Sequence, residues 1–307
     1  MSKFSTAIKL IKSNKAFFLA ATLKNLNFLF PDKLYLQLMF RCKMGRSLDL
    51  KNPRTFNEKL QWLKLYNRNP LYTTLVDKFS VKKWVAERIS EDHIIPTLGV
   101  WNNAKDIDFA KLPKQFVLKT TNGGGGDVVI CKDRTKLDIT QVVEHLNKSL
   151  KVSLYKKNRE WPYKNVPPRI IAEKYMEDES GELRDYKFFC FGGIPKYCQV
   201  IRGRYVKETI DFYDMEWNHM PFVGLNLAVE NGLEPVEKVK CLDSLVEASK
   251  ILSNGLPFVR VDFYVIKSQF YFGEMTFYPN SGFGKFRPDE WNYKLGDLLK
   301  LPLEALK

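Results

Sequence analysis

Four consecutive glycines, at positions 123–126, separate two short strand-like runs and constrain the fold more than any other stretch. The runs are residues 116–118 and 128–130, and Lys119 ends the first of them. Glycine accepts positive φ angles and lets the backbone approach another molecule closely. The N–H groups of such a loop can also bind an anion. The pattern predicts a phosphate-binding flap with a lysine at its root, although a plain flexible hairpin tip fits it equally well.

This stretch matches neither of the two common glycine-rich nucleotide motifs. A P-loop requires Gly-Lys-Ser/Thr at its end, and no such sequence follows these glycines. A Rossmann fingerprint leads from a strand into a helix, whereas these glycines lead into a second strand-like run.

The 307 residues carry a formal net charge of +14. Such an excess predicts an anionic partner, which is a nucleotide, an acidic glycan, nucleic acid or an anionic membrane. Residues 1–45 hold eight Lys and Arg residues against one acid, Asp32. Nucleic acid is not expected as a partner, because no RNP, helix-turn-helix or zinc signature is present.

The spacing of cysteine and histidine argues against several kinds of site. The five cysteines are scattered without a Cys-x-x-Cys pair, so neither a zinc site nor a disulfide framework is expected. Free thiols suit a reducing cytoplasm, which is the expected location. The histidines, His93, His145 and His219, are dispersed, so histidine-based nucleophilic catalysis is not favoured.

An apolar stretch at residues 17–30 permits two interpretations. It is shorter than the roughly 20 apolar residues that a membrane-spanning helix needs. No small-residue cleavage site of a signal peptide follows it. We expect it either to pack as a helix on the body of the protein or to lie on an anionic membrane with its lysines toward the headgroups. The second interpretation places a cytoplasmic protein peripherally on the inner face of a membrane.

Hydrophobic periodicity and turn residues predict an α+β fold of mostly antiparallel sheet with helices on one side. A capping box formed by Thr55 and Glu58 predicts that a helix starts there. Further helices are predicted at residues 77–88, 140–150, 239–252 and 291–300, and a basic, proline-containing loop at 151–168.

Two strand-like runs, residues 258–266 and 270–277, predict a hairpin with its turn centred on Ser268. This register places Asp262 opposite Glu274. Directly opposed like charges destabilise a sheet. A divalent cation held by both carboxylates would compensate, and Mg²⁺ prefers oxygen ligands.

The same register places Tyr264 opposite Phe272. A slip by one residue would put the two carboxylates on opposite faces, and two solvated carboxylates are the alternative to a metal site. Thr276 and Asn280 are further candidate oxygen donors. If the carboxylates repel one another, amide substitutions are expected to leave the fold intact or to stabilise the metal-free protein.

The ordered set of short motifs looks like the ATP-grasp superfamily. These motifs are Asp77-Lys78, Lys119 before the glycines, Glu173-Lys174-Tyr175, Asp185-Tyr186-Lys187, Arg260-x-Asp262 and Glu274-x-Thr276. More narrowly, residues 55–64 and 273–277, with Asp77-Lys78, resemble the TupA-like ATP-grasp family, named for a teichuronopeptide biosynthesis protein. The resemblance covers residues 31 to 302. It implies two α+β lobes that clamp ATP, at residues 76–180 and 181–307, after a basic and mostly helical N-terminal region at 1–75.

The resemblance also implies roles for individual residues. The implied ATP-binding residues are Lys78, Lys119, Asn122, Gly123, Gly124, Gly125, Gly126, Glu173, Lys174, Tyr175 and Met176. The implied catalytic residues are Lys187, Arg202 and Arg260, with Arg204 as a further candidate. The implied Mg²⁺ ligands are Asp262 and Glu274. The usual Glu-x-Asn of the superfamily reads Glu274-x-Thr276 here, and Asn280 is expected to substitute.

The implied chemistry is ADP-forming ligation of a carboxylate to an amine. Such chemistry needs positioning and charge neutralisation, which lysines and Mg²⁺ supply without histidine. The family context implies an acidic sugar or glycan and an amine or amino acid as substrates, in the biosynthesis of a bacterial surface polysaccharide or capsule. One alternative is a sugar phosphotransferase on the same fold, with Asp185 as base. Another is a glycosyltransferase, although its Asp-x-Asp motif is missing.

Overall fold

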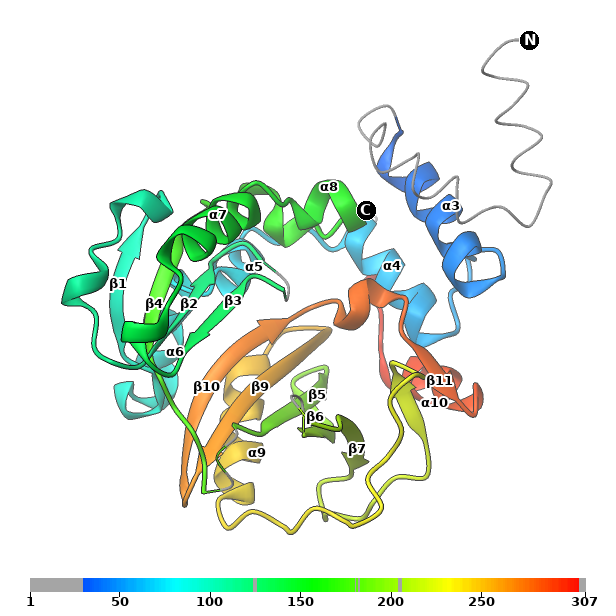
Figure 1. The fold of residues 1–307 in the computed structure, drawn as a ribbon. Helices are drawn as coiled ribbons and strands as arrows, with labels where there is room; N and C mark the ends of the chain where they lie inside the picture. Colours follow the sequence, from blue (N-terminus) through cyan, green and yellow to red (C-terminus); the bar gives the residue numbers. More distant parts are fainter. Residues whose placement is uncertain (1–29, 124–125, 180, 182, 204–205, 304–307) are drawn as a thin grey trace.

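The structure, a computed structural model of the chain, describes residues 30–123, 126–179, 181, 183–203 and 206–303 (Figure 1). Apart from Phe30, the apolar stretch at residues 17–30 lies outside the described residues, so both of its interpretations stay predictions. In the described part of the chain, no helix is both long enough and apolar enough to cross a membrane.

Helices lie around two central sheets (Figure 1). They are α3 (Asp32–Met44), α4 (Phe56–Tyr66), α5 (Leu71–Val76), α6 (Ser80–Ile89), α7 (Ile139–Leu150), α8 (Leu154–Asn158), α9 (Leu242–Ser253) and α10 (Glu290–Leu298). The described part of the N-terminal region is mostly helical, as expected.

The smaller sheet has the strand order β1-β4-β2-β3 and is antiparallel throughout. Its strands are β1 (Thr97–Trp101), β2 (Phe116–Thr120), β3 (Val128–Cys131) and β4 (Ile170–Lys174). β2 and β3 are the two runs on either side of the glycines, which confirms the predicted hairpin. Helix α7 packs against this sheet through β2.

The larger sheet has the order β10-β9-β5-β6-β7 and is also antiparallel. Its strands are β5 (Asp185–Phe191), β6 (Ile194–Arg202), β7 (Thr209–Tyr213), β9 (Phe258–Ile266) and β10 (Gln269–Thr276). A separate two-stranded sheet pairs β8 (Val223–Leu225) with β11 (Lys285–Arg287). Helix α9 packs on β5, β6 and β9. The expected α+β class with mostly antiparallel sheet is confirmed.

Helix α4 begins at the predicted capping box. The Thr55 side chain accepts a hydrogen bond from the Glu58 N–H at 3.3 Å, and Glu58 Oε2 accepts one from the Thr55 N–H at 2.9 Å. Phe56, the first residue of the helix, packs edge-on against Phe258 of β9, with ring centroids 5.0 Å apart. Helix α4 therefore packs against the larger sheet, and the expected division into three regions stays a prediction.

The hairpin that carries the two carboxylates has a tighter turn than predicted. Two residues, Lys267 and Ser268, join β9 to β10, and Lys267 adopts a φ of 57°. As a result, Tyr264 lies opposite Tyr271 and not opposite Phe272. The predicted register is therefore wrong at the turn end of the hairpin.

A β-bulge restores the predicted pairing farther along the same hairpin. The register shifts between Phe272 and Glu274, and Glu274 then lies opposite Asp262, as predicted. A bulge inserts one extra residue into one strand and re-aims the neighbouring side chains. The extra residue is Gly273, where a Cβ would lie 3.0 Å from the backbone oxygen of Asp262, so this close approach favours glycine.

Gly296 in α10 approaches the start of α4 so closely that a Cβ would lie 2.1 Å from the Arg54 carbonyl oxygen. We expect Gly296→Ala to lower the free energy of unfolding by about 1–3 kcal/mol through overpacking. At an exposed helix position, replacing Gly by Ala would instead raise the free energy of unfolding by roughly 1 kcal/mol, because Ala is the better helix former. Urea unfolding followed by circular dichroism measures the change. Asp297→Ala, at the exposed next position, is the control, and a variant Gly296→Ala that is as stable as wild type would contradict the close contact.

Candidate active site

A cavity of about 620 Å³ is lined by residues of both sheets. Its apolar lining comes from Ile95, Val117, Val128, Ile130, Met176, Leu183 and Ile201. Its charged lining comes from Lys78, Lys119, Asp127, Lys132, Glu173, Lys174, Asp185, Lys187 and Glu274. Small-molecule sites typically have volumes of about 300–1,000 Å³ and combine apolar walls with a few polar groups. The cavity fits this description.

Most of the residues predicted to bind ATP line this cavity. They are Lys78, Lys119, Gly126, Glu173, Lys174, Tyr175 and Met176. Gly124 and Gly125 lie outside the described residues. The larger sheet contributes Lys187, a predicted catalytic residue, and Glu274, a predicted metal ligand. The fold therefore brings together segments that are up to about two hundred residues apart in the sequence.

Two side chains fix the root of the glycine flap. The Lys78 ammonium donates a hydrogen bond to the Gly123 carbonyl oxygen. Asp127, which is buried, accepts hydrogen bonds from the Thr120 N–H at 3.2 Å and from the Thr120 hydroxyl at 2.7 Å. A Cβ at Gly123 would lie 2.0 Å from Asp127 Oδ2, so this glycine is required by the packing of the flap on itself.

Asn122 anchors the flap to a neighbouring segment. Its side-chain amide donates hydrogen bonds to the carbonyl oxygens of Leu150 at 3.3 Å and Val152 at 3.1 Å, at the end of α7. Neither Asn122 nor Gly123 lines the cavity. The structure thus gives the Asn122 side chain a structural partner away from the predicted ATP contact.

Glu173 in β4 is held between two lysines. Its carboxylate forms ion pairs with Lys119 at 2.6 Å and with Lys82 at 2.5 Å. Burial alone would raise the pKa of Glu173, but the two lysines outweigh burial and lower it. Both oxygens of this carboxylate, which was predicted to bind ATP, are therefore engaged by Lys119 and Lys82.

The predicted carboxylate pair is compensated by protein cations. Asp262 accepts hydrogen bonds from Arg260 at both oxygens, each at 2.7 Å, and a further one from the Lys187 ammonium. Lys187 also pairs with Asp185 at 2.9 Å. Burial raises the pKa of Asp262, and Arg260 and Lys187 offset part of this rise. The compensation that the sequence analysis assigned to a metal is thus provided by Arg260 and Lys187.

This arrangement corrects the expected effect of removing the Asp262 charge. Asp262→Asn would leave Arg260 and Lys187, both buried, without their shared counterion. Breaking a buried ion pair from one side is strongly destabilising. The expectation that amide substitutions stabilise the metal-free protein is therefore withdrawn for Asp262.

Glu274 differs from Asp262 because it faces the cavity. Its side chain is 36% exposed, whereas that of Asp262 is 2% exposed. Burial acts to raise the pKa of Glu274, but the surrounding cations lower it to about 2. These cations are, in order of effect, Lys78, Lys187, Arg260 and Lys119. Glu274 is therefore an ionised carboxylate on which cations from both lobes converge.

Magnesium, which the resemblance implies, is commonly held by one or two carboxylates together with the phosphates of a substrate. Glu274 fits this requirement because its carboxylate lines the cavity. Asp262 fits it less well, because Arg260 and Lys187 engage both of its oxygens. Within the described ranges, no group of three or more His, Cys, Asp and Glu side chains forms a metal cluster.

Arg202, predicted to be catalytic, lies outside the cavity. Neighbouring residues of a strand point to opposite faces of a sheet, and it is Ile201 that lines the cavity. Arg202 instead forms an ion pair with Asp211 at 2.9 Å and donates to the Glu234 carbonyl oxygen at 2.7 Å. The structure thus does not bring Arg202 to the cavity, and its catalytic role stays a prediction; Arg204 lies outside the described residues.

Asn280 and Thr276 are tied to protein groups. The Asn280 side-chain amide donates to the Leu225 carbonyl oxygen at 2.9 Å, and Asn280 does not line the cavity. The Thr276 hydroxyl accepts a hydrogen bond from Arg260 at 3.1 Å. Arg260 itself lies just behind the cavity wall and reaches Glu274 Oε1 at 3.3 Å. The role of Asn280 as a metal ligand stays a prediction that the geometry does not support.

Two further residues of the site are not indicated by the sequence motifs. Lys82 reaches Glu173 from α6, and no local pattern in the sequence indicates this pairing. Tyr264 lines the cavity, and burial, with carboxylates such as Asp185 nearby, raises its pKa well above the usual range. The predicted hairpin placed Tyr264 two residues after Asp262 and on the same face of the strand, but assigned it no role in a site.

Glu173→Gln tests the link between the two lysines. Because the pKa of Glu173 is lowered in the folded state, its carboxylate adds stability above the ordinary pKa of glutamate, and this stability is lost as the pH falls through the lowered value. We expect the substitution to lower the free energy of unfolding by about 3–5 kcal/mol at neutral pH. The difference in free energy of unfolding between this variant and wild type should narrow below about pH 4. Urea unfolding across pH measures both effects.

The control for this experiment is Glu144→Gln, at an exposed position of α7. It should stay close to wild type at every pH. A gap between wild type and Glu173→Gln that stays constant down to acidic pH would show that the carboxylate charge is not what matters.

The solved structures to which this chain is similar include two D-alanine–D-alanine ligases and a D-cycloserine synthetase. The D-alanine–D-alanine ligase of Bacillus anthracis complexed with ATP has 17% sequence identity and a TM-score of 0.41, over 74% of this chain and 63% of that chain. The D-alanine–D-alanine ligase of Helicobacter pylori has 13% identity and a TM-score of 0.41, over 81% of this chain and 70% of that chain. D-cycloserine synthetase DcsG has 15% identity and a TM-score of 0.41, over 77% of this chain and 72% of that chain. The match thus spans less than two thirds of the length of the ATP-bound ligase.

A search of curated proteins gave no match. By contrast, the family model described as TupA-like ATPgrasp matches residues 58–300, which is most of the chain. This match confirms the resemblance carried by the motifs and, with the two facing sheets, the expected ATP-grasp fold. The chain belongs to the TupA-like ATP-grasp family.

Proposed function

We propose that this chain is an ATP-dependent, ADP-forming ligase that joins a carboxylate to an amine. The observation that carries the proposal is that Lys78, Lys119 and Lys187 line the same cavity as Glu274, while Arg260 contacts Glu274 at 3.3 Å from behind the cavity wall. Phosphoryl transfer requires positioning and charge neutralisation more than covalent work by the protein. Cations that come from both lobes suit this task, and membership of an ATP-grasp family supports it.

In this proposal, the adenine of ATP occupies the apolar part of the cavity. The triphosphate extends toward Lys78 and Lys119, beneath the flap that includes Gly126. The N–H groups of the flap and the lysines then face the phosphate oxygens. Glu274 is the residue that would hold Mg²⁺, whose contribution is to neutralise charge on the phosphates.

The reaction proceeds in two steps. A carboxylate oxygen of the first substrate attacks the γ-phosphorus, the bond to the leaving oxygen breaks, and ADP and an acyl phosphate form. The nitrogen of the amine then attacks the acyl carbon, phosphate leaves, and the nitrogen loses a proton as the amide forms. Lys187, fixed between Asp185 and Asp262, and Arg260 stabilise the negative charge of the transferred group. Asp185 lines the cavity and is our candidate to accept the proton of the amine.

For the substrates, we infer an acidic sugar or glycan and an amine or amino acid, in the biosynthesis of a bacterial surface polysaccharide. The cationic part of the cavity and the net charge of +14 support an anionic substrate. The family context supports the pathway. The inferred location is the cytoplasm.

Lys78→Met should weaken ATP binding about 10- to 100-fold, because a hydrogen bond to a charged group is worth roughly 1.5–3 kcal/mol. Isothermal titration calorimetry measures the affinity. Lys83→Met, at an exposed position of α6, removes the same charge nearby and should bind ATP as wild type does. Equal affinities in both variants would remove Lys78 from the nucleotide site.

Incubation with ATP, Mg²⁺, uronic acids and amino acids should yield ADP and an amide, measured by nucleotide chromatography and mass spectrometry. Glu274→Gln should lower turnover by at least roughly 100-fold, because it removes a charge that organises the phosphate end. Glu144→Gln, exposed on α7, is the matched control. AMP as the product, or full activity of Glu274→Gln, would contradict the mechanism. ADP accompanied by a phosphorylated sugar and no amide would favour a phosphotransferase.

A further inference from the structure

The positive charge of the chain is concentrated in two segments that are far apart in the sequence. Residues 30–68 and 148–168 together contain fifteen Lys and Arg residues and four acidic residues, a balance of +11. Residues 1–29 add five lysines and no acid. The rest of the chain has two more acidic than basic residues. The net charge of +14 therefore comes from these two segments and from residues 1–29, and not from the rest of the chain.

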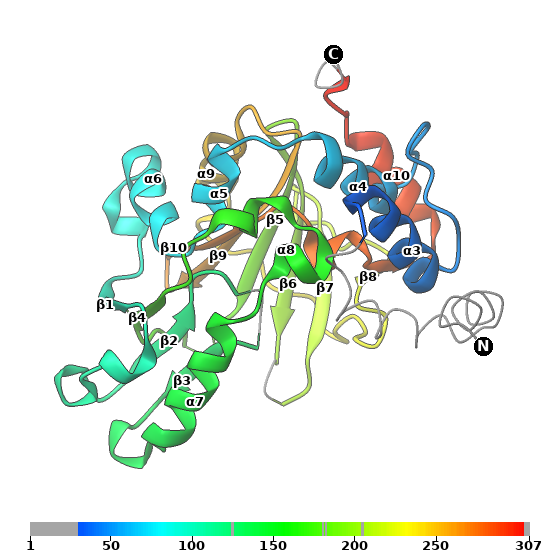
Figure 2. The ribbon, with the colours of Figure 1, turned by 90° about the horizontal axis from the view of Figure 1, so that it is seen from above.

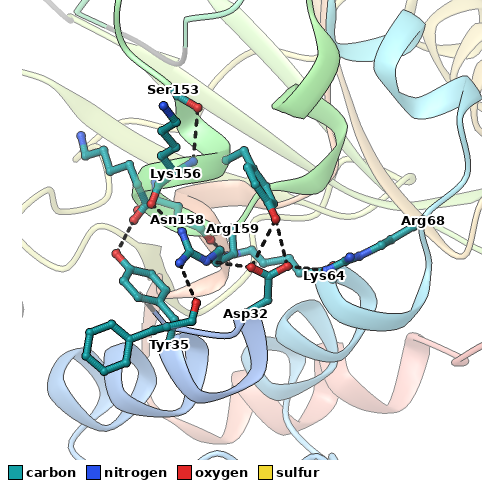
Figure 3. A network of polar contacts seen from close by, with 11 residues as sticks. Asp32, Tyr35, Lys64, Arg68, Ser153, Lys156, Asn158 and Arg159 are labelled. Carbon is teal, nitrogen blue, oxygen red and sulfur yellow. Dashed lines mark hydrogen bonds and ion pairs between the residues drawn. The ribbon is translucent and has the colours of Figure 1, made fainter. Parts of the chain in front are cut away.

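The fold places these two segments side by side, at α3 and α8 (Figures 1, 2 and 3). The Tyr35 hydroxyl in α3 donates a hydrogen bond to the Lys157 carbonyl oxygen at 2.8 Å. The Arg159 guanidinium, at the end of α8, lies 4.1 Å from the centre of the Tyr35 ring. Arg159 also forms an ion pair with Asp32 at 2.9 Å. These contacts join α3 and α8 into one continuous surface.

The acidic residues of the two segments do little to offset this charge. Asp32 is engaged by Arg68 at 2.6 Å as well as by Arg159 (Figure 3). Glu58 and Glu160 are buried, and Asp49 is the exposed one of the four. Lysines therefore outnumber exposed acidic residues in both segments.

Each of the two segments also exposes an apolar side chain that follows an exposed lysine in the sequence. Leu34 is 44% exposed and Val152 is 42% exposed. We call this surface the basic face and define it by Lys33, Leu34, Lys151, Val152, Lys156 and Lys157, of which the lysines are exposed. Segments that lie on a membrane surface combine exposed lysines with exposed apolar side chains in this way.

We propose that the basic face binds the surface of an anionic lipid bilayer. Lysines are attracted to anionic headgroups, and exposed Leu and Val side chains make contact at the boundary between headgroups and acyl chains. A soluble polyanion, such as an acidic polysaccharide, would engage the lysines but would gain nothing from Leu34 and Val152. The bilayer accounts for both kinds of side chain.

The test is co-sedimentation of the full-length protein with vesicles of phosphatidylcholine alone or of equimolar phosphatidylcholine and phosphatidylglycerol. We expect binding to the anionic vesicles only. The triple variant Lys33→Gln, Lys151→Gln and Lys157→Gln should bind them roughly 100-fold more weakly, since each lysine near an anionic surface contributes about fivefold. The control replaces three exposed lysines elsewhere, Lys196, Lys238 and Lys240, by Gln and should stay within about threefold of wild type.

A second variant separates a bilayer from a soluble polyanion. Leu34→Gln with Val152→Gln keeps every charge, and it should weaken vesicle binding while leaving binding to heparin unchanged. Three results would overturn the proposal: no binding of wild type to anionic vesicles, equal losses in the two triple-lysine variants, or vesicle binding by the Leu34 and Val152 variant equal to that of wild type. The last result would favour a soluble polyanion as the partner.

Discussion

Buried carboxylates hold the cations of the cavity in place, and the rest of the site depends on these ion pairs. Glu173 holds Lys119 in the smaller sheet, and Asp262 holds Arg260 and Lys187 in the larger sheet. A cluster of cations without such partners would repel itself and would lose too much solvation to remain buried. The two carboxylates therefore do structural work that allows a strongly cationic wall to exist before any phosphate arrives.

Unlike Glu173 and Asp262, Glu274 is not buried behind the cations. It faces the cavity and lies within the combined field of Lys78, Lys119, Lys187 and Arg260, which lowers its pKa to about 2. Under the proposed function, Glu274 thus neutralises part of the cationic charge that phosphate oxygens would neutralise once nucleotide binds. Because those cations come from both lobes, the charge of Glu274 also reduces the repulsion between the lobes across the cavity.

Local patterns in the sequence were sufficient to predict features that depend on near neighbours. The capping box at Thr55 and the flap hairpin both follow from residues close together in the chain. The pairing of Asp262 with Glu274 was also predicted, although from a register that is wrong at the turn. Strand alternation, if applied to β6, would have shown that Arg202 and Ile201 point to opposite faces. The contact of Lys82 with Glu173 could not be predicted, because it joins a helix to a distant strand through tertiary packing.

The two irregularities of the β9–β10 hairpin have a joint consequence for how the gene can change. With a two-residue turn and no bulge, Glu274 would lie opposite Val261 and would point to the face covered by α9. Gly273 supplies the one residue that corrects this offset. An insertion in the turn alone, or a deletion of Gly273 alone, would shift Glu274 out of its pairing with Asp262. The two changes together would restore this pairing. The position of Glu274 therefore depends on the number of residues in this hairpin as well as on their identity. Relatives are expected to gain and lose residues here only in compensating pairs.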